Sequence, residues 1–142
     1  MKKILAVDAI GCLVDYQGKI NKNIKRLIDR FKIKKIILTN ANNEEKKKFL
    51  KNVNYEIFSL KHKPDKTNPK YYKDFLSKHN LKVEQLIYFE HNIKAVKSAE
   101  TVGIITHHFD GNLKSLENFL SLYLDKKQSI LKKNEKNFHY YS

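Results

Sequence analysis

The chain has 142 residues, the size of one domain, and its 41% apolar content is enough for a core that needs neither disulfides nor a metal. The single cysteine, Cys12, excludes an internal disulfide, and no apolar run approaches the roughly 20 residues of a membrane-spanning helix. The apolar stretch after Met1 is short and ends at Asp8, unlike a secretory signal, so we expect a cytoplasmic protein.

The formal net charge of +14 raises the question of nucleic-acid binding, because lysines near phosphates release counterions. Only Arg26 and Arg30 are arginines among the 29 basic residues, however, and readers of bases and phosphates usually employ the forked guanidinium. The chain is also rich in Asn, so its Lys and Asn content fits an A+T-rich coding background. We favour a solvated, lysine-coated surface and keep nucleic acid as an open but less favoured partner.

Short apolar runs alternate with amphipathic helical segments, which is typical of a parallel sheet covered by helices. In chain order we expect a strand at 4–8, a helix at 23–31, a strand at 35–39, a helix at 43–53, a strand at 55–60, a helix at 69–80, a strand at 86–90, a helix at 93–102, a strand at 103–106 and a last helix after residue 112. The expected fold is a three-layer α/β/α, doubly wound, five-stranded parallel sheet.

Local signals support several of these helix ends. Pro69 suits a first helical turn, Gly103 suits a C-terminal stop, and Asn112 can cap the last helix. After residue 125 the pattern fades into a lysine-rich stretch. We therefore divide the chain into a core domain, 1–125, and a basic tail or helix extension, 126–142.

Polar side chains follow the strands where a doubly wound sheet binds its ligands, beyond the carboxyl ends. Those that we expect at this edge are Asp8, Thr39, Asn40, Lys66, Glu90 and His91. Lys63, which precedes Pro64, is a rival to Lys66. We interpret Cys12 as a small core residue, and His107 with His108 as a strand end rather than a metal pair.

Over roughly residues 3 to 110, four motifs in this order resemble the haloacid dehalogenase-like (HAD) superfamily. "ILAVDAIGCL" resembles the first motif, a hydrophobic strand with Asp-x-Asp-Gly, and "IILTN" resembles the second, a strand that ends in Thr or Ser. "KTNPKYYKDFLSKHNL" is similar to the third, and "LIYFEHNIKAVKSAETVGI" to the fourth. None of these motifs is specific alone, but four of them in the right order, each after a predicted strand, are much stronger evidence.

The resemblance implies a phosphohydrolase that forms an aspartyl-phosphate. Asp8 would be the nucleophile, since covalent catalysis splits a hard hydrolysis into two easier steps. Thr39, Asn40 and Lys66 would bind the phosphoryl group, with Thr39 donating a hydrogen bond and Lys66 neutralising charge. Three of these residues also have a purely structural interpretation. Asp8 could be a capping acid, Thr39 a hydrogen-bond partner of its own backbone, and Lys66 a solvated side chain.

The resemblance also implies a Mg²⁺ ion, a hard cation that takes oxygen ligands. Its protein ligands would be the carboxylates of Asp8 and Glu90 and the backbone carbonyl of Ile10. The fourth motif departs from the family here, because Glu90 and His91 stand where paired aspartates are usual. Glu is one methylene longer than Asp, and His is a poor Mg²⁺ ligand.

The first motif departs from the family at Ile10, which stands where phosphatases carry a second Asp that protonates the leaving oxygen and activates water. Losing a general acid or base typically costs 10²- to 10⁴-fold in rate. No cap insertion fits between Val14 and Thr39 or between Leu60 and Leu86. We therefore expect a capless domain with weak or altered phosphatase activity on a phosphorylated substrate, and the missing cap makes a macromolecule one candidate for it. The alternative is an inactive module that binds a phosphorylated ligand, nucleic acid or protein.

Overall fold

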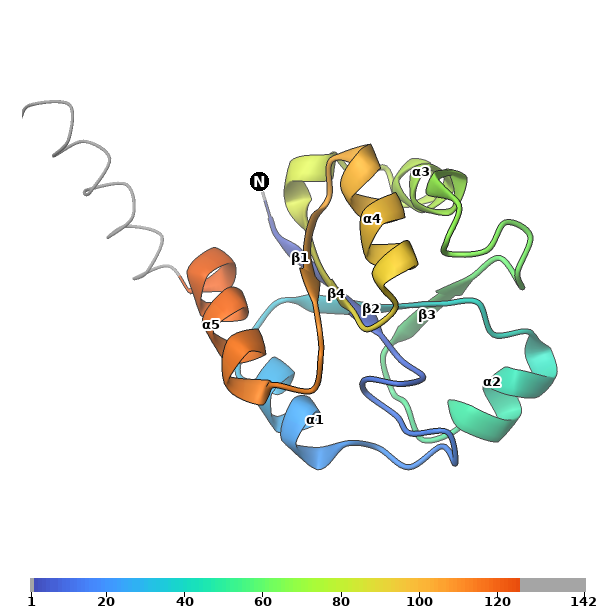
Figure 1. Cartoon of the computed structure of the whole chain (residues 1–142), viewed down its shortest axis with the longest axis horizontal. Helices are drawn as coiled ribbons and strands as arrows, with labels where there is room; N and C mark the ends of the chain where they lie inside the picture. Colours follow the sequence, from blue (N-terminus) through green and yellow to red (C-terminus); the bar gives the residue numbers. More distant parts are fainter. Residues whose placement is uncertain (1, 126–142) are drawn as a thin grey trace, which may run out of the picture.

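The computed structural model describes residues 2–125, so the predicted tail, 126–142, lies outside the described residues. The elements follow one another as strands and helices in alternation (Figure 1). They are β1 (Ile4–Asp8), α1 (Lys22–Asp29), β2 (Lys34–Thr39), α2 (Asn43–Phe49), β3 (Glu56–Ser59), α3 (Pro69–Lys78), a 3₁₀ turn (Val83–Gln85), β4 (Leu86–Glu90), α4 (Ile93–Val102), β5 (Ile105–His108) and α5 (Leu113–Leu124).

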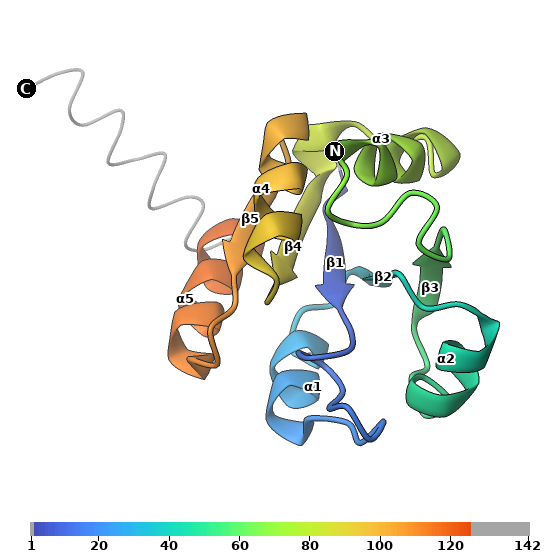
Figure 2. The same ribbon diagram turned by 45° about the vertical axis from the view of Figure 1, so that its right-hand side comes forward.

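The five strands form one parallel sheet in the order β3-β2-β1-β4-β5, with β1 in the middle. One face is covered by α1 and α5, and the other by α3 and α4 (Figure 2). The predicted three-layer, doubly wound α/β architecture is confirmed. In the described residues no cap domain is inserted between the strands, and none of the described helices is long and apolar enough to cross a membrane.

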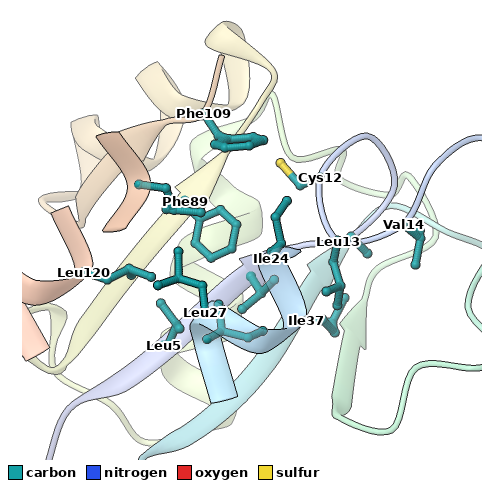
Figure 3. Packing of buried hydrophobic residues seen from close by; sticks show 14 of the residues in the cluster. Leu5, Cys12, Leu13, Val14, Ile24, Leu27, Ile37, Phe89, Phe109 and Leu120 are labelled. Carbon is teal, nitrogen blue, oxygen red and sulfur yellow. The ribbon is translucent and has the colours of Figure 1, made fainter. Parts of the chain in front are cut away.

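The central strand shows why this sequence builds two cores. Side chains alternate between the faces of a strand, and both faces of β1 are covered. Leu5 packs into the cluster under α1 and α5 (Figure 3), as does Val7, whereas Ala6 packs into the cluster under α3 and α4. A continuous apolar run that ends in a charged residue therefore delivers Asp8 from a fully buried strand.

Each of the five described α-helices begins after an Asn whose side chain accepts a backbone N–H of the first turn. Such a cap satisfies a donor that the helix leaves unpaired, and is worth about 0.5–2 kcal/mol relative to Ala. The caps are Asn21, Asn42, Asn68, Asn92 and Asn112. Coding background is thus an incomplete account of the Asn content.

Several predicted boundaries differ from the structure by one to four residues, and two of these differences have clear local reasons. The last strand begins at Ile105 rather than at residue 103, because Gly103 takes a left-handed backbone (φ 100°) and caps α4. Helix α2 ends at Phe49 rather than at residue 53, because Leu50 leaves helical geometry while its side chain stays buried in the core. The apolar periodicity thus continues past the end of the helix.

Candidate active site

The three central strands bring polar side chains to one edge of the sheet. Asp8, Thr39 and Glu90 are the last residues of β1, β2 and β4, and all three are almost fully buried. Their strands are adjacent and parallel, so the three side chains leave the sheet at the same end. The predicted convergence of sequence-distant residues is present in the structure.

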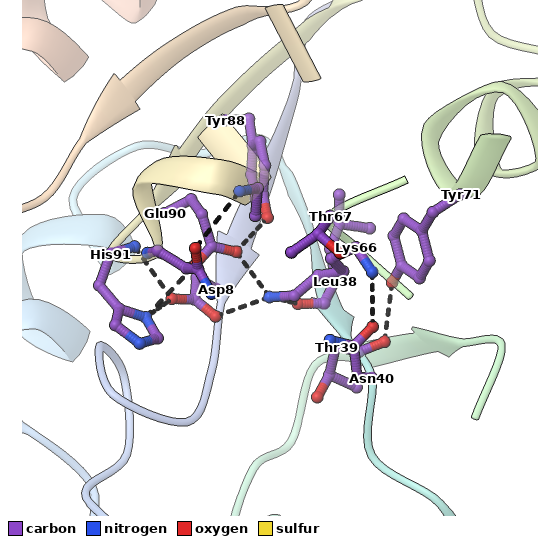
Figure 4. Close-up of polar contacts among 12 residues, drawn as sticks. Asp8, Leu38, Thr39, Asn40, Lys66, Thr67, Tyr71, Tyr88, Glu90 and His91 are labelled. Carbon is purple, nitrogen blue, oxygen red and sulfur yellow. Dashed lines mark hydrogen bonds and ion pairs between the residues drawn. The ribbon is translucent and has the colours of Figure 1, made fainter. Parts of the chain in front are cut away.

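A buried ammonium joins the two acids. Lys66 Nζ lies 2.9 Å from Asp8 Oδ1 and 2.6 Å from Glu90 Oε1, and it donates to the carbonyl of Leu38 at 3.1 Å (Figure 4). The Lys66 residue is only 6% exposed, whereas its rival Lys63 is exposed. Lys66 is therefore the lysine that meets Asp8.

Burial and charge act in opposite directions on this pair. Burial alone would raise the pKa of the Asp8 carboxyl, but the Lys66 ammonium and the His91 hydrogen bond hold it well below its usual range. Burial alone would lower the pKa of Lys66, but Asp8 and Glu90 raise it well above its ordinary value. Asp8 is consequently an anion and Lys66 a cation at neutral pH.

Glu90 is fully buried and both of its carboxylate oxygens have protein partners. Oε1 accepts from Lys66 and, at 2.5 Å, from the hydroxyl of Tyr88. Oε2 accepts from the backbone N–H of Asn92 at 2.9 Å and lies 3.2 Å from His91 Nδ1. Burial raises the pKa of Tyr88, so that its hydroxyl remains a donor.

His91 is the site residue for which sequence reasoning assigned no role. Its Nδ1 and its backbone N–H both contact Asp8 Oδ2, the latter at 3.2 Å. Its ring lies against Gly11, where a β-carbon would stand 2.7 Å from Cε1. The hydrogen bonds to Asp8 and Glu90 raise the pKa of His91 to about 10. The sequence feature that could have indicated this position of His91 is Gly11 of the first motif, because a residue without a β-carbon leaves room for the His91 ring.

Thr39 and Asn40 have local partners of their own. Thr39 Oγ1 accepts the N–H of Ala41 at 3.2 Å, which leaves the hydroxyl proton to donate. Asn40 Oδ1 accepts the backbone N–H of Lys66 at 2.8 Å and so fixes the loop that carries this lysine. Both readings of Thr39, as a partner of its own backbone and as a donor to a ligand, are therefore compatible with the geometry.

A cavity of about 160 Å³ opens over these groups. It is lined by Asp8, Ile10, Thr39, Asn40, Ala41, Glu45, His62, Lys66, Glu90, His91 and Asn92. At its rim, His62 Nε2 lies 3.2 Å from Glu45 Oε1 of α2, and its Nδ1 lies 3.2 Å from Asp65 Oδ2 of the same loop. Sequence reasoning missed this arrangement because Glu45 and the loop belong to separate segments. The predicted site residues all face one small, polar cavity.

As they lie, the predicted ligands do not form a Mg²⁺ site. Mg²⁺ needs oxygens at about 2.0–2.1 Å in near-octahedral order, whereas all four carboxylate oxygens of Asp8 and Glu90 already have protein partners. In residues 2–125, the group of side chains spaced to hold a metal is Asp8, Cys12 and His91, with donor atoms within 4.8 Å of one another. One oxygen, one sulfur and one nitrogen do not suit a hard cation, and burial raises the pKa of the Cys12 thiol. The magnesium site stays a prediction.

No family model matches the chain, and no curated protein matches it. Solved structures do. A HAD family enzyme from Bacteroides thetaiotaomicron, in complex with magnesium and inorganic phosphate, is 15% identical, with a TM-score of 0.62 over 79% of this chain and 96% of that one. A HAD-superfamily hydrolase from Ehrlichia chaffeensis is 12% identical, with a TM-score of 0.57 over 88% of this chain and 100% of that one. The described chain therefore has the fold of the haloacid dehalogenase-like superfamily, without a cap domain.

Proposed function

We propose that this chain is a HAD-type phosphohydrolase with Asp8 as its nucleophile and with slow turnover. The observation that carries this proposal is the Asp8 carboxylate at the cavity, 2.9 Å from the buried ammonium of Lys66. The low pKa of Asp8 keeps it ionised, as a nucleophile must be. Lys66 balances the charge that accumulates when an anionic oxygen meets a phosphoryl group.

The reaction has two steps. An oxygen of Asp8 bonds to phosphorus while the bond from phosphorus to the leaving oxygen breaks, which gives an aspartyl-phosphate. Water then attacks that phosphorus and releases inorganic phosphate and the free carboxylate. Thr39 would donate its O–H to a phosphoryl oxygen, and the amide N–H groups of Asn40 would be further donors, since both residues line the cavity. Ile10 cannot give or take a proton, so substrates with good leaving groups are favoured.

The substrate class is a phosphorylated molecule. The Bacteroides thetaiotaomicron structure contains magnesium and inorganic phosphate, and Mg²⁺, held by Asp8, the Ile10 carbonyl and Glu90, is the cofactor that the resemblance predicts for this chain. The ion would require the His91 ring to leave Asp8. Because no cap covers the cavity in the described chain, a macromolecular phosphorylated substrate is the one that would best exclude water from it.

A second candidate is a non-catalytic module that binds a phosphorylated ligand. Two observations favour it: each carboxylate oxygen of Asp8 and Glu90 is already engaged, and Ile10 supplies no proton. Such a module would keep Thr39, Asn40 and Lys66 as anion contacts. It would bind phosphate reversibly and would form no covalent intermediate.

Covalent labelling separates the two candidates. The protein is incubated with acetyl phosphate, with Mg²⁺ or with EDTA, and intact mass and peptide mapping locate an added phosphoryl group. The phosphohydrolase predicts a hydroxylamine-sensitive phosphate on Asp8 that is absent in Asp8→Asn and kept in Asp74→Asn, a control on the exposed face of α3. Reversible phosphate binding without any label would favour the module.

A further inference from the structure

The imidazole ring of His91 lies between the two acidic side chains of the site. Its Nδ1 contacts Asp8 Oδ2 and lies 3.2 Å from Glu90 Oε2 (Figure 4). One N–H thus faces two carboxylate oxygens that come from different strands. A position close to two carboxylate oxygens of different elements is where a cation would be expected.

The backbone around His91 holds the ring in this place. Gly11 has a left-handed φ of +94°, and a β-carbon there would lie 2.7 to 3.0 Å from three ring atoms, closer than side-chain carbons approach. His108 Nε2 lies 2.9 Å from the carbonyl of His91, and the next residue, Asn92, caps α4. The position of the His91 ring is therefore fixed by the residues packed around it.

The contacts of the cluster formed by Asp8, Glu90, Lys66 and His91 leave neither carboxylate an oxygen without a partner. Lys66 Nζ contacts Asp8 Oδ1 and Glu90 Oε1, and His91 Nδ1 lies beside Asp8 Oδ2 and Glu90 Oε2. An Asp in place of His91 would put a third carboxylate where the ring now lies. Three carboxylates so close together repel one another, and a divalent cation would offset that repulsion.

The side chain of His91 is 36% exposed and lines the cavity. An anion that enters the cavity meets Lys66 and His91 together with the donors of Thr39 and Asn40. Charge-assisted hydrogen bonds of this kind are roughly twice as strong as neutral ones. The three N–H groups of Lys66 are donated to Asp8, Glu90 and Leu38, so Lys66 acts on a phosphate through its charge alone. The ring of His91 and the donors of Thr39 and Asn40 are the groups left to contact the anion.

We propose that the imidazole of His91 takes the place of the divalent cation, so that the site binds phosphate without a metal. The inference rests on the proposed function only in taking a phosphoryl group as the ligand. The inference assigns His91 a binding role, whereas the resemblance of the motifs assigned it none. It also makes Mg²⁺ compete with the His91 ring for Asp8 Oδ2. A divalent ion can enter only when the ring moves away.

The test uses inorganic phosphate as the probe, with calorimetry and thermal shift, in EDTA and in excess Mg²⁺. The wild-type chain should bind phosphate in EDTA, with a dissociation constant that Mg²⁺ changes by less than about twofold. His91→Asn should bind about tenfold more weakly in both conditions, because the amide carries no charge. His91→Asp should lose binding in EDTA and regain it with Mg²⁺, and Mg²⁺ alone should raise its melting temperature.

Lys94→Asn is the matched control for net charge, because Lys94 is an exposed residue of α4 that is not among the residues lining the cavity. It should bind phosphate like the wild type. Loss of wild-type binding in EDTA, or undiminished binding by His91→Asn, would overturn the inference and leave the phosphohydrolase standing. If no variant binds phosphate in either condition, the inference and the proposed function both fail.

Discussion

The ammonium nitrogen of Lys66 lies 2.6 Å from Oε1 of Glu90, whose side chain is fully buried. The same nitrogen lies 2.9 Å from Asp8 Oδ1, so one cation serves two buried anions. Removing water from a charge is expensive, and a buried carboxylate without a partner is strongly unfavourable. The cluster around Asp8 is therefore a point on which the stability of the fold depends.

Replacing Lys66 by Met should destabilise the fold by about 3–5 kcal/mol, because it leaves two buried carboxylates without their shared partner. Urea unfolding at neutral pH, followed by circular dichroism, measures the change. Lys70→Met is the matched control, since Lys70 pairs with Asp74 at 2.8 Å on the surface, with 66% of its side chain exposed. Such a pair contributes about 0–1 kcal/mol. Equal losses in the two variants would contradict a buried cluster.

Much of the fold could be predicted from the sequence because β1, β2 and β4 are apolar runs of strand length, and helices with clear periodicity separate them. The sheet edge then brought Asp8, Thr39 and Glu90 together by topology alone. Lys66 was predicted from the resemblance of its segment to the third motif, with Lys63 as a rival, and the burial of Lys66 beside Asp8 decides between the two. Local and topological rules were sufficient for the strand-end positions but not for this lysine.

Two features of the site could not be predicted this way, because they depend on how side chains pack between segments. The place of the His91 ring depends on the missing β-carbon of Gly11, 80 residues earlier in the chain. The contacts of His62 with Glu45 and Asp65 depend on a loop in which His62 itself has a left-handed φ of 67°. Periodicity says nothing about either.

Replacing Ile10 by Asp should raise the rate at which the chain loses an aspartyl-phosphate. Ile10 lines the cavity beside Asp8, and a positioned acid or base is typically worth 10²- to 10⁴-fold, so a gain of about tenfold or more is expected. Release of phosphate from acetyl phosphate measures the steady rate, and the decay of labelled protein measures the second step. Ile10→Asn has nearly the same shape as the Asp variant but cannot transfer a proton, so a similar gain there would rule out proton transfer as the cause.

The stability of the fold should fall as the pH rises through the alkaline range, by an amount that depends on His91. Its pKa is raised from the ordinary 6.5 to about 10 in the folded chain. Its contribution is therefore complete below about pH 6.5 and is lost as the pH rises toward 10. The side chain is 36% exposed, so screening makes the effect smaller than the shift alone implies.

Urea unfolding of the wild type and of His91→Asn between about pH 6 and pH 9 measures this dependence. The difference in unfolding free energy between the two proteins should narrow as the pH rises. Taking this difference cancels the titration of the lysines and tyrosines that both proteins share. A difference that stays constant over this range would show that the imidazolium is not held by Asp8.

Gly11→Ala tests the place of the His91 ring without changing any charge. Gly11 has φ +94°, and a new β-carbon would lie 2.7 Å from the ring. Gly111→Ala is the matched control, since its φ is +101° but nothing lies within 4 Å of a β-carbon there. Both variants should lose about 1–2 kcal/mol from the left-handed backbone. Only Gly11→Ala should lose more than this and also bind phosphate more weakly in EDTA, because the ring must leave Asp8. Equal stability losses together with unchanged phosphate binding would mean that the ring is not held against Gly11 in solution.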